Sequence, residues 1–283
     1  MNQDAGASSP HLDQGEQDQA ATHAAPRALV IHEIVREEGE MAITRTPGGL
    51  AWSGLAAGLS MGFSFFTQSL LHGGLPDPPW RHLIDSLGYS VGFVIVILAR
   101  QQLFTESTLT AVLPVLTRKD GKTLLATLRL WAIVLIANLV GTWIFAGLLL
   151  PEGVFRPEVV AAMRELATEP MSSGFGATVL KALFAGWLIA TMVWLLPSAR
   201  SARLATILLV TYVVALGHLS HIIAGSVEAA YAVLTGAAPF GDYVLKFLVP
   251  TLIGNTIGGV SLVALVNHAA IAPDLQRGQP EPR

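Results

Sequence analysis

The stretch LARQQLFTESTLTAVLPVL, residues 98–116, lies inside a long apolar segment and yet carries an arginine, two glutamines, a glutamate and several hydroxyl side chains. A helix that faces lipid should not carry these groups, because ionisable side chains within a membrane are costly and nearly always face protein or water. The stretch therefore indicates a polar break inside a membrane span, provided that the rest of the chain is built for a membrane.

The composition of the whole chain supports this condition. Of the 283 residues, 52% are hydrophobic and 13% are charged, whereas soluble domains carry about a quarter charged residues. A bilayer span needs roughly 20 predominantly apolar residues. Six segments are candidates, at 48–71, 83–116, 130–150, 182–199, 204–227 and 247–271. The chain is therefore predicted to be an all-α integral membrane protein with six transmembrane helices.

Several functional classes are disfavoured. The chain has no cysteine, which excludes disulfides, thiolate metal sites and thiol catalysis. It also lacks the H-E-x-x-H motif of zinc proteases. We therefore expect no enzyme activity, no cofactor and no nucleic-acid partner.

The segments outside the candidate spans predict the remaining organisation. Residues 1–26 carry almost no large apolar side chains and predict a disordered tail. Residues 27–45 mix apolar and charged positions at helical spacing and predict an amphipathic surface helix, with a solvated linker helix as the alternative. Residues 46–272 would form the membrane domain and 273–283 a second tail. Basic residues in the short loops near 118–122 and 200–203 place these loops and both termini in the cytoplasm.

The six candidate spans fall into two halves. Three precede the loop at 151–174 and three follow it, and an odd number of spans inverts the second half relative to the first. The second span of each half is interrupted, by RQQLFTEST at 100–108 and by GHLSHIIAGS at 217–226. Interrupted spans at matching positions indicate a transport site near the membrane midplane. We therefore predict two inverted three-helix repeats with broken second and fifth helices.

The first break offers groups that suit an anion. The N-terminal end of a half-helix carries partial positive charge and free N–H groups. Thr105, Ser107 and Thr108 add hydroxyl donors without a full charge. Alternatively, these hydroxyls bond to helix carbonyls, as is common in membrane helices. The sequence thus indicates a weakly charged anion site and leaves the role of the hydroxyls open.

The second break contains two histidines, His218 and His221. Imidazole changes charge near neutral pH and serves as donor, acceptor or proton relay, with a purely structural hydrogen bond as the alternative. Because no third ligand accompanies the two rings, a shared metal is not expected. In the first break, Arg100 and Glu106 either form an ion pair, with each other or between the repeats, or Arg100 reads the anion directly.

Short motifs in both breaks and in the last span occur in combination. They are LFT at 103–105 followed by Ser and Thr, HIIA at 221–224, and GNTIGG at 254–259 with Asn-His at 267–268. Together they resemble the formate/nitrite transporter family over about residues 45–272. The resemblance implies an aquaporin-like six-helix protomer with its own pore, and five protomers around a central axis.

The resemblance also implies roles for single residues. Leu103 and Phe104 would form an apolar constriction, Thr105 would face the pore, and His221 would be the central histidine between two apolar gates. The chain departs from the family pattern at four places. These are Arg100-Gln101-Gln102 before LFT, Gly225 where an asparagine is common, Gly186 where a polar residue is expected, and EPMSSGFG (169–176), which has no lysine for the mouth.

The substrates implied by the resemblance are small monovalent weak-acid anions such as formate, nitrite and hydrosulfide, which cross the bacterial inner membrane passively or with a proton. Desolvating a bare anion is costly. The anion either stays charged beside Thr105 and Arg100, or takes a proton from His221 or from water that His221 orders. Two other functions stay open, a neutral-solute channel and a non-conducting protein plugged by Arg100 and Glu106. The absence of Asn-Pro-Ala argues against water and glycerol.

Overall fold

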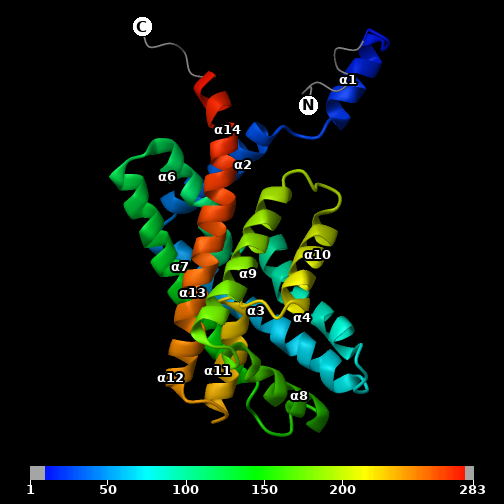
Figure 1. The fold of residues 1–283 in the computed structure, drawn as a ribbon, viewed down its shortest axis with the longest axis vertical. Coiled ribbons are helices and arrows are strands. Elements are labelled where there is room, and N and C mark those ends of the chain that lie inside the picture. The colour runs from blue at the N-terminus through cyan, green and yellow to red at the C-terminus, as the bar shows by residue number, and fades with distance from the viewer. Residues whose placement is uncertain (1–9, 278–283) are drawn as a thin grey trace.

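The structure is a computed structural model that describes residues 10–277, and all regular elements in this range are helical (Figure 1). In chain order they are α1 (Gln14–His23), α2 (Ala28–Thr44), α3 (Pro47–Gly74), α4 (Arg81–Leu98), α5 (Phe104–Thr110), α6 (Val112–Arg118), α7 (Gly121–Leu148), α8 (Pro157–Ala167), the 3-10 turn η1 (Glu169–Met171), α9 (Phe175–Leu195), α10 (Arg203–Leu216), α11 (Ala224–Leu234), α12 (Phe240–Asp242), the π-helical η2 (Tyr243–Leu248), α13 (Val249–Ile257), the π-helical η3 (Gly258–Leu265) and α14 (Val266–Arg277).

Among the described residues, five helices are long and apolar enough to cross a membrane. They are α3, α4, α7, α9 and the continuous run from α12 to α14, Phe240–Pro273. The predicted span at 204–227 consists of two shorter apolar helices, α10 and α11. The predicted span at 83–116 likewise consists of α4, α5 and α6, with non-helical residues between Leu98 and Phe104.

The long helices begin at residues whose chemistry favours a helix start. At α7, the Asp120 carboxylate accepts hydrogen bonds from the N–H groups of Lys122 and Thr123, which satisfies two donors that the first turn leaves unpaired. At α3, Thr46 caps the N–H of Gly49, and Pro47 occupies the first turn, where its missing N–H costs nothing. These polar ends hold the apolar helices in register.

Two glycines allow close helix crossings. A Cβ atom at Gly58 of α3 would overlap the backbone of Asn138 on α7, and one at Gly186 of α9 would overlap the backbone of Asn255 on α13. Small residues at such crossings let membrane helices approach closely and gain packing energy. The family resemblance led us to expect a polar residue at position 186. Gly186 instead provides a close packing contact between α9 and α13.

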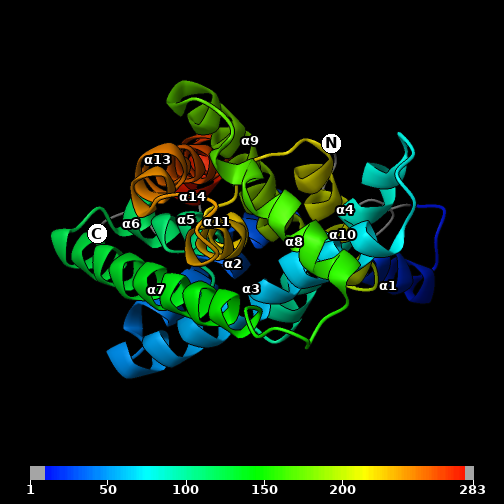
Figure 2. The ribbon, with the colours of Figure 1, turned by 90° about the horizontal axis from the view of Figure 1, so that it is seen from below.

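The helices on either side of the breaks interleave. The half-helix α5 packs against α9 and η3 of the second half, whereas α11 packs against α3 and α7 of the first half. Viewed along the long axis, α5 and α11 lie inside the bundle formed by the longer helices (Figure 2). The breaks therefore meet in the interior.

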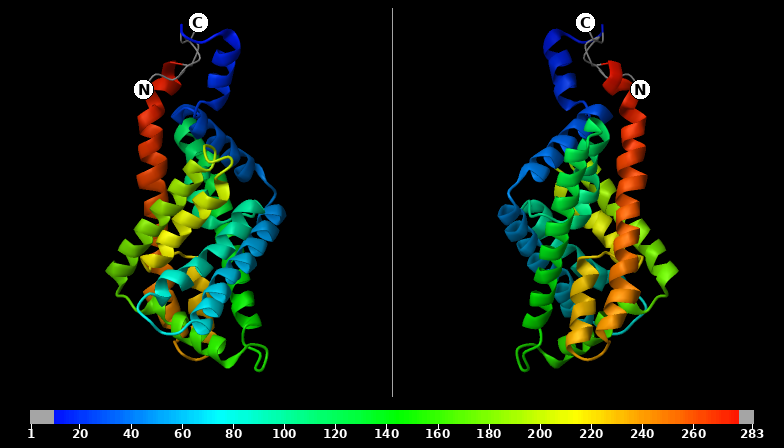
Figure 3. Two further views of the ribbon diagram at one scale, coloured as in Figure 1. Left: turned by 90° about the vertical axis from the view of Figure 1, so that its right-hand side faces the viewer. Right: turned by 90° about the vertical axis from the view of Figure 1, so that its left-hand side faces the viewer.

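The described ends of the chain lie together. α2 and α14 sit at one end of the bundle and α8 at the other (Figure 3). α2 packs against α6, α7 and α14 and falls within the range 27–45 predicted for a helix; its place at a membrane surface stays a prediction. Residues 14–23 of the predicted tail form α1, and residues 1–9 and 278–283 lie outside the described range, so the predicted disorder of both tails also stays a prediction.

Candidate functional site

The two breaks have the same backbone geometry. Arg100 follows α4 with φ of 53°, and His218 follows α10 with φ of 47°. In each break the N–H of the next residue bonds back to a carbonyl of the preceding helix at 3.0 Å. Positive φ is uncommon outside glycine, so its occurrence at both positions marks the same sharp turn out of the helix.

An asparagine side chain holds the first break. The Asn138 Oδ1 accepts from the Phe104 N–H at 2.9 Å, while its Nδ2 donates to the carbonyls of Gly54 at 2.7 Å and Gln102 at 2.9 Å. Backbone groups left without partners inside a membrane cost several kcal/mol each. The single amide removes that cost for the Phe104 N–H and the Gln102 carbonyl, and its bond to Gly54 ties the break to α3.

Asn255 holds the second break in the same way. Its Oδ1 accepts from the Ile222 N–H at 2.9 Å, and its Nδ2 donates to the carbonyls of Ala182 at 2.8 Å and Ser220 at 2.9 Å. Sequence reasoning missed the roles of both asparagines. The signal was available, because each is an amide side chain in the middle of a span that carries no Lys, Arg, Asp or Glu.

These bonds narrow the expectation that free N–H groups of the half-helices bind the anion. The N–H groups of Phe104 and Ile222 donate to the asparagines, and the Gln102 N–H donates to the Ser53 hydroxyl at 3.1 Å. Side chains of neighbouring helices therefore satisfy these three donors, and binding of the anion by other N–H groups of the half-helices stays a prediction.

A buried pair, Thr105 and His221, joins the two breaks. The Thr105 Oγ1 lies 2.8 Å from the His221 Nε2, and both residues are at most 1% exposed. The Ala224 N–H donates to the His221 Nδ1 at 3.2 Å. Because Nδ1 accepts, the neutral ring carries its proton on Nε2 and donates it to Thr105. The Thr105 hydroxyl is then free to donate its own proton to a solute.

The two neighbouring hydroxyls donate to carbonyls of their own half-helix. The Ser107 hydroxyl donates to the Phe104 carbonyl at 2.6 Å, and the Thr108 hydroxyl donates to the Thr105 carbonyl at 2.7 Å. These are the bonds to helix carbonyls that the sequence left open as an alternative. Of the three hydroxyls, Thr105 is the one engaged with the second break.

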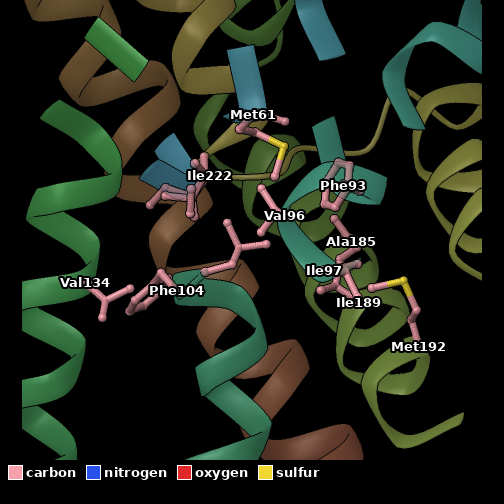
Figure 4. Close-up of a cluster of buried hydrophobic side chains, with 14 of the residues drawn as sticks. Met61, Phe93, Val96, Ile97, Phe104, Val134, Ala185, Ile189, Met192 and Ile222 are labelled. Atoms are coloured by element: carbon pink, nitrogen blue, oxygen red, sulfur yellow. The ribbon is translucent and has the colours of Figure 1, made fainter. Parts of the chain in front are cut away.

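Apolar side chains surround the pair. Leu103 and Phe104 are buried in one cluster with Phe93 and Ile222, and the edge of the Phe93 ring lies against His221 with centroids 4.9 Å apart. Figure 4 shows the cluster, in which residues of α4 lie beside residues of α9. An ion that crosses this region loses its hydration, so the cluster forms a barrier to bare charge.

Arg100 does not pair with Glu106 in the structure. Its Nη2 lies 2.8 Å from the Glu38 Oε1 of α2, and its side chain is 72% exposed. Both Arg100 and Glu106 line a cavity of about 290 Å³ that reaches Leu103 and is bordered by Arg203, and we call it the α2-side cavity. The expected ion pair within the break is therefore replaced by a contact with the N-terminal helix.

A second, smaller cavity of about 60 Å³ reaches His221, and we call it the central chamber. Glu228, Lys181 and Tyr89 also line it, and the Lys181 Nζ donates to the Ser173 hydroxyl at 3.0 Å. The fold brings Glu228 and Lys181 together at the chamber, which sequence spacing could not reveal because they lie on different helices.

His218 lines the central chamber together with His221 and also lines a third cavity, of about 570 Å³, beside α8. We call it the α8-side cavity. His218 forms an ion pair with Glu169 and stacks on His82. No group of three or more His, Cys, Asp or Glu residues within 10–277 is arranged to hold a metal ion.

The protein is thus a bundle of apolar helices, and a buried polar pair lies between the cavities at its two ends. This is the architecture of a membrane channel or transporter. The family model described as "Formate/nitrite transporter" matches residues 29–269. The chain is 41% identical over 249 residues to "Inner membrane protein YfdC" of Escherichia coli (strain K12), covering 88% of this chain and 80% of that protein. This chain belongs to the formate/nitrite transporter family.

Further relatives agree. The chain is 25% identical over 249 residues to "Formate channel BtFdhC" of Bacillus thuringiensis, covering 84% of this chain and 93% of that protein. A solved "Pentameric formate channel with formate bound" shares the fold with a TM-score of 0.68 at 20% identity, over 84% of this chain and 99% of that one. The solved "FNT family ion channel" also shares the fold, with a TM-score of 0.69 at 22% identity, over 86% of this chain and 96% of that one. The protein is a multi-pass membrane protein and not an enzyme.

Proposed function

We propose that the protein conducts small monovalent weak-acid anions, of the formate, nitrite and hydrosulfide type, through each protomer. The observation that carries the proposal is the hydrogen bond between Thr105 and His221 at the meeting point of the two breaks. It leaves the Thr105 hydroxyl proton without an acceptor among the described residues, in surroundings of apolar side chains. A single donor without a standing charge suits a small acceptor that is weakly basic.

The arrangement of the path is two inverted three-helix repeats that form six spans. Supporting observations are the matching positive φ values of Arg100 and His218, and the matching amides of Asn138 and Asn255. The reciprocal packing of α5 on the second half and α11 on the first is what an inverted pair requires. Broken helices then present their ends to one common site.

The cargo crosses the apolar barrier as the neutral acid. A neutral His221 ring, with Nδ1 engaged by the Ala224 N–H, has no proton to give except by becoming an imidazolate, which is unfavourable. Thr105 therefore binds and orients the anion, while the proton comes from a donor other than His221. Of the two sources named by the sequence, this disfavours the His221 ring, which instead orients the Thr105 hydroxyl.

A plugged, non-conducting pore is disfavoured by the position of Arg100. Its side chain is mostly exposed and paired with Glu38 outside the break. The path of the anion therefore continues past Leu103 into the α2-side cavity, where Arg203 faces it.

Assembly and placement follow from the relatives. A pentamer is supported by the pentameric formate channel with which the chain shares its fold, and an inner-membrane location by the name of the Escherichia coli relative. With both termini in the cytoplasm, the α2-side cavity would face the cytoplasm and the α8-side cavity the opposite compartment.

The test is anion influx into liposomes that contain the purified protein. Formate, nitrite, hydrosulfide and chloride are compared at external pH 5.5 and 7.5, for the natural protein and for His221→Asn. We expect saturable flux of the weak-acid anions but not chloride, faster at the lower pH. His221→Asn should lower the rate about tenfold or more, the value of one hydrogen bond to a charged group, and leave the ratio between the two pH values unchanged.

Two results would oppose the proposal. Absence of saturable weak-acid flux would exclude the substrate class. A pH ratio that collapses in His221→Asn would mean that the imidazole itself hands over the proton.

A further inference from the structure

Three histidines and one buried aspartate form a connected cluster at the α8-side cavity. The His72 Nδ1 lies 2.7 Å from the Asp85 Oδ2, and the His82 Nδ1 lies 3.4 Å from the Asp85 Oδ1. The His82 ring stacks on the His218 ring, with centroids 4.3 Å apart and planes 7° from parallel. The cluster brings together α3, α4 and the loop between α10 and α11.

Asp85 lies at the centre of the cluster and is unusually placed. It is 1% exposed, and its Oδ1 has no hydrogen bond among the described residues. A buried carboxylate is stabilised when cationic partners face it. The imidazoles of His72 and His82 are the groups in contact with it, so Asp85 joins the two rings into one cluster.

The charge of the α8-side cavity depends on these rings. Besides the three histidines, its ionisable lining consists of Asp77, Arg81, Asp85, Glu165 and Glu169. One arginine and four carboxylates give the lining a formal charge of about −3 when the histidines are neutral and about zero when all three are protonated. This difference in charge decides whether the cavity repels an anion. Lys181 and Glu228 stand further in, at the central chamber.

The cluster is connected both to solvent and to the central chamber. The side chains of His218 and Glu169 are 45% and 38% exposed, so water reaches them. The same two residues also line the central chamber that reaches His221. A solute that moves from the α8-side cavity to the chamber therefore passes the stacked histidine pair.

We propose that His72, His82 and His218, held by Asp85, form a proton-exchange site that gives the weak-acid cargo its proton before the cargo enters the central chamber. This inference rests on the proposed function, which requires a proton that His221 does not supply. An N–H bond of a protonated ring breaks, and an O–H bond forms on the carboxylate of the cargo. The ring becomes neutral and takes its next proton from hydronium ion in the cavity.

The proposed site gives a different pH dependence of the influx rate from the simple entry of cargo that was already protonated in bulk water. If only such pre-protonated cargo entered, the influx rate would rise about tenfold for each unit of falling pH, until the acid itself is fully protonated. A site of ionisable side chains saturates once it is fully protonated. The natural protein should therefore show a plateau in its rate at the acidic end of the range from pH 5 to 8, and a variant without the site should not.

The experiment measures formate influx into proteoliposomes between pH 5 and 8. The variants are His82→Gln with His218→Asn, because asparagine tolerates the positive φ at 218, and separately Asp85→Asn, which keeps the shape of the buried side chain. His11→Gln removes a histidine outside the membrane domain and serves as the control. We expect both site variants to lose the plateau and to be at least about tenfold slower at pH 7, and the control to keep the natural profile.

The outcomes separate the two proposals. If the variants keep the plateau, the proton-exchange site is overturned and the proposed function stands. If the double variant fails to fold, Asp85→Asn decides alone by the same criterion. If the natural protein carries no formate, nitrite or hydrosulfide at any pH, the proposed function fails first.

Discussion

Replacing Asn138 with leucine tests how the breaks are held. Leucine has the same branched arrangement of heavy atoms but neither donates nor accepts, so Asn138→Leu leaves the Phe104 N–H and the Gln102 carbonyl without their partner. The Gly54 carbonyl lies within α3 and loses only its additional bond. Hydrogen bonds between membrane helices are worth about 0.6 kcal/mol each on average, and an unsatisfied buried group costs about 1–3 kcal/mol. Two unsatisfied groups and one lost bond then cost between about 3 and 7 kcal/mol, and we expect about 4.

The assay is unfolding in mixed micelles by titration with dodecyl sulfate, followed by tryptophan fluorescence. Asn255→Leu is the matched variant, because its amide makes three bonds of 2.8–2.9 Å in the second break. Ile136→Leu changes an exposed apolar side chain on α7 and is the control. Both asparagine variants should lose comparable stability and the control none. An Asn138→Leu protein as stable as the control would refute the assignment of these bonds as the support of the break.

Three further predictions concern packing, pH and the exposed ion pair. Gly186→Ala should destabilise the protein by about 1–3 kcal/mol through overpacking against α13, whereas Gly176→Ala, which has open space around it, should be neutral or slightly stabilising in the same titration. Burial lowers the pKa of His32 despite its contact with Glu33, so the docked state of α2 favours the neutral ring. The docking of α2 should therefore be intact above about pH 6.5 and weaken as the pH falls below it. Hydrogen exchange of the α2 amides at pH 7.5 and 5.5 measures this change. Arg100→Gln should change stability by less than about 1 kcal/mol, because exposed ion pairs contribute little.

Each of these has an opposing result. Equal stability of the two glycine variants would mean that α9 and α13 do not cross closely at Gly186. For His32, the control is His32→Gln, whose exchange should not depend on pH beyond the intrinsic rate; α2 protection that is the same at both pH values in the natural protein would contradict the argument. A loss of several kcal/mol in Arg100→Gln would place that guanidinium in a buried network.

The positions of the two breaks could be anticipated from the sequence, because polar residues within apolar spans have few structural uses. The contact of Thr105 with His221 could not, because the family resemblance gave each residue a role without pairing them. What could not be anticipated is which polar group each of them contacts. The partner of Arg100 is Glu38, which lies far away in sequence on a helix assigned to the surface. The charges in the sequence are equally compatible with a pair between Arg100 and Glu106. Whether Arg100 contacts Glu38 or Glu106 depends on how α2 folds back over the break.

The hydrogen-bond partners of the N–H groups at the breaks are a second feature that could not be predicted from the sequence. Sequence reasoning treats the N–H groups at a helix start as free, because the helix itself cannot satisfy them. Asn138 and Asn255 reach these groups from other helices, and that reach depends on the close crossings at Gly58 and Gly186. The α8-side cluster escaped prediction for the same reason, since His72, Asp85 and His218 come from three separate segments.

The central claim is that the Thr105 hydroxyl, oriented by His221, binds the cargo at the barrier. Formate influx at pH 6 through Thr105→Val and Thr105→Ser tests it most directly, because valine keeps the shape and serine keeps the hydroxyl. The account predicts a rate about tenfold or more below the natural one for Thr105→Val, and a rate near the natural one for Thr105→Ser. Equal rates for the two variants would show that the hydroxyl does not act on the cargo and would contradict the account.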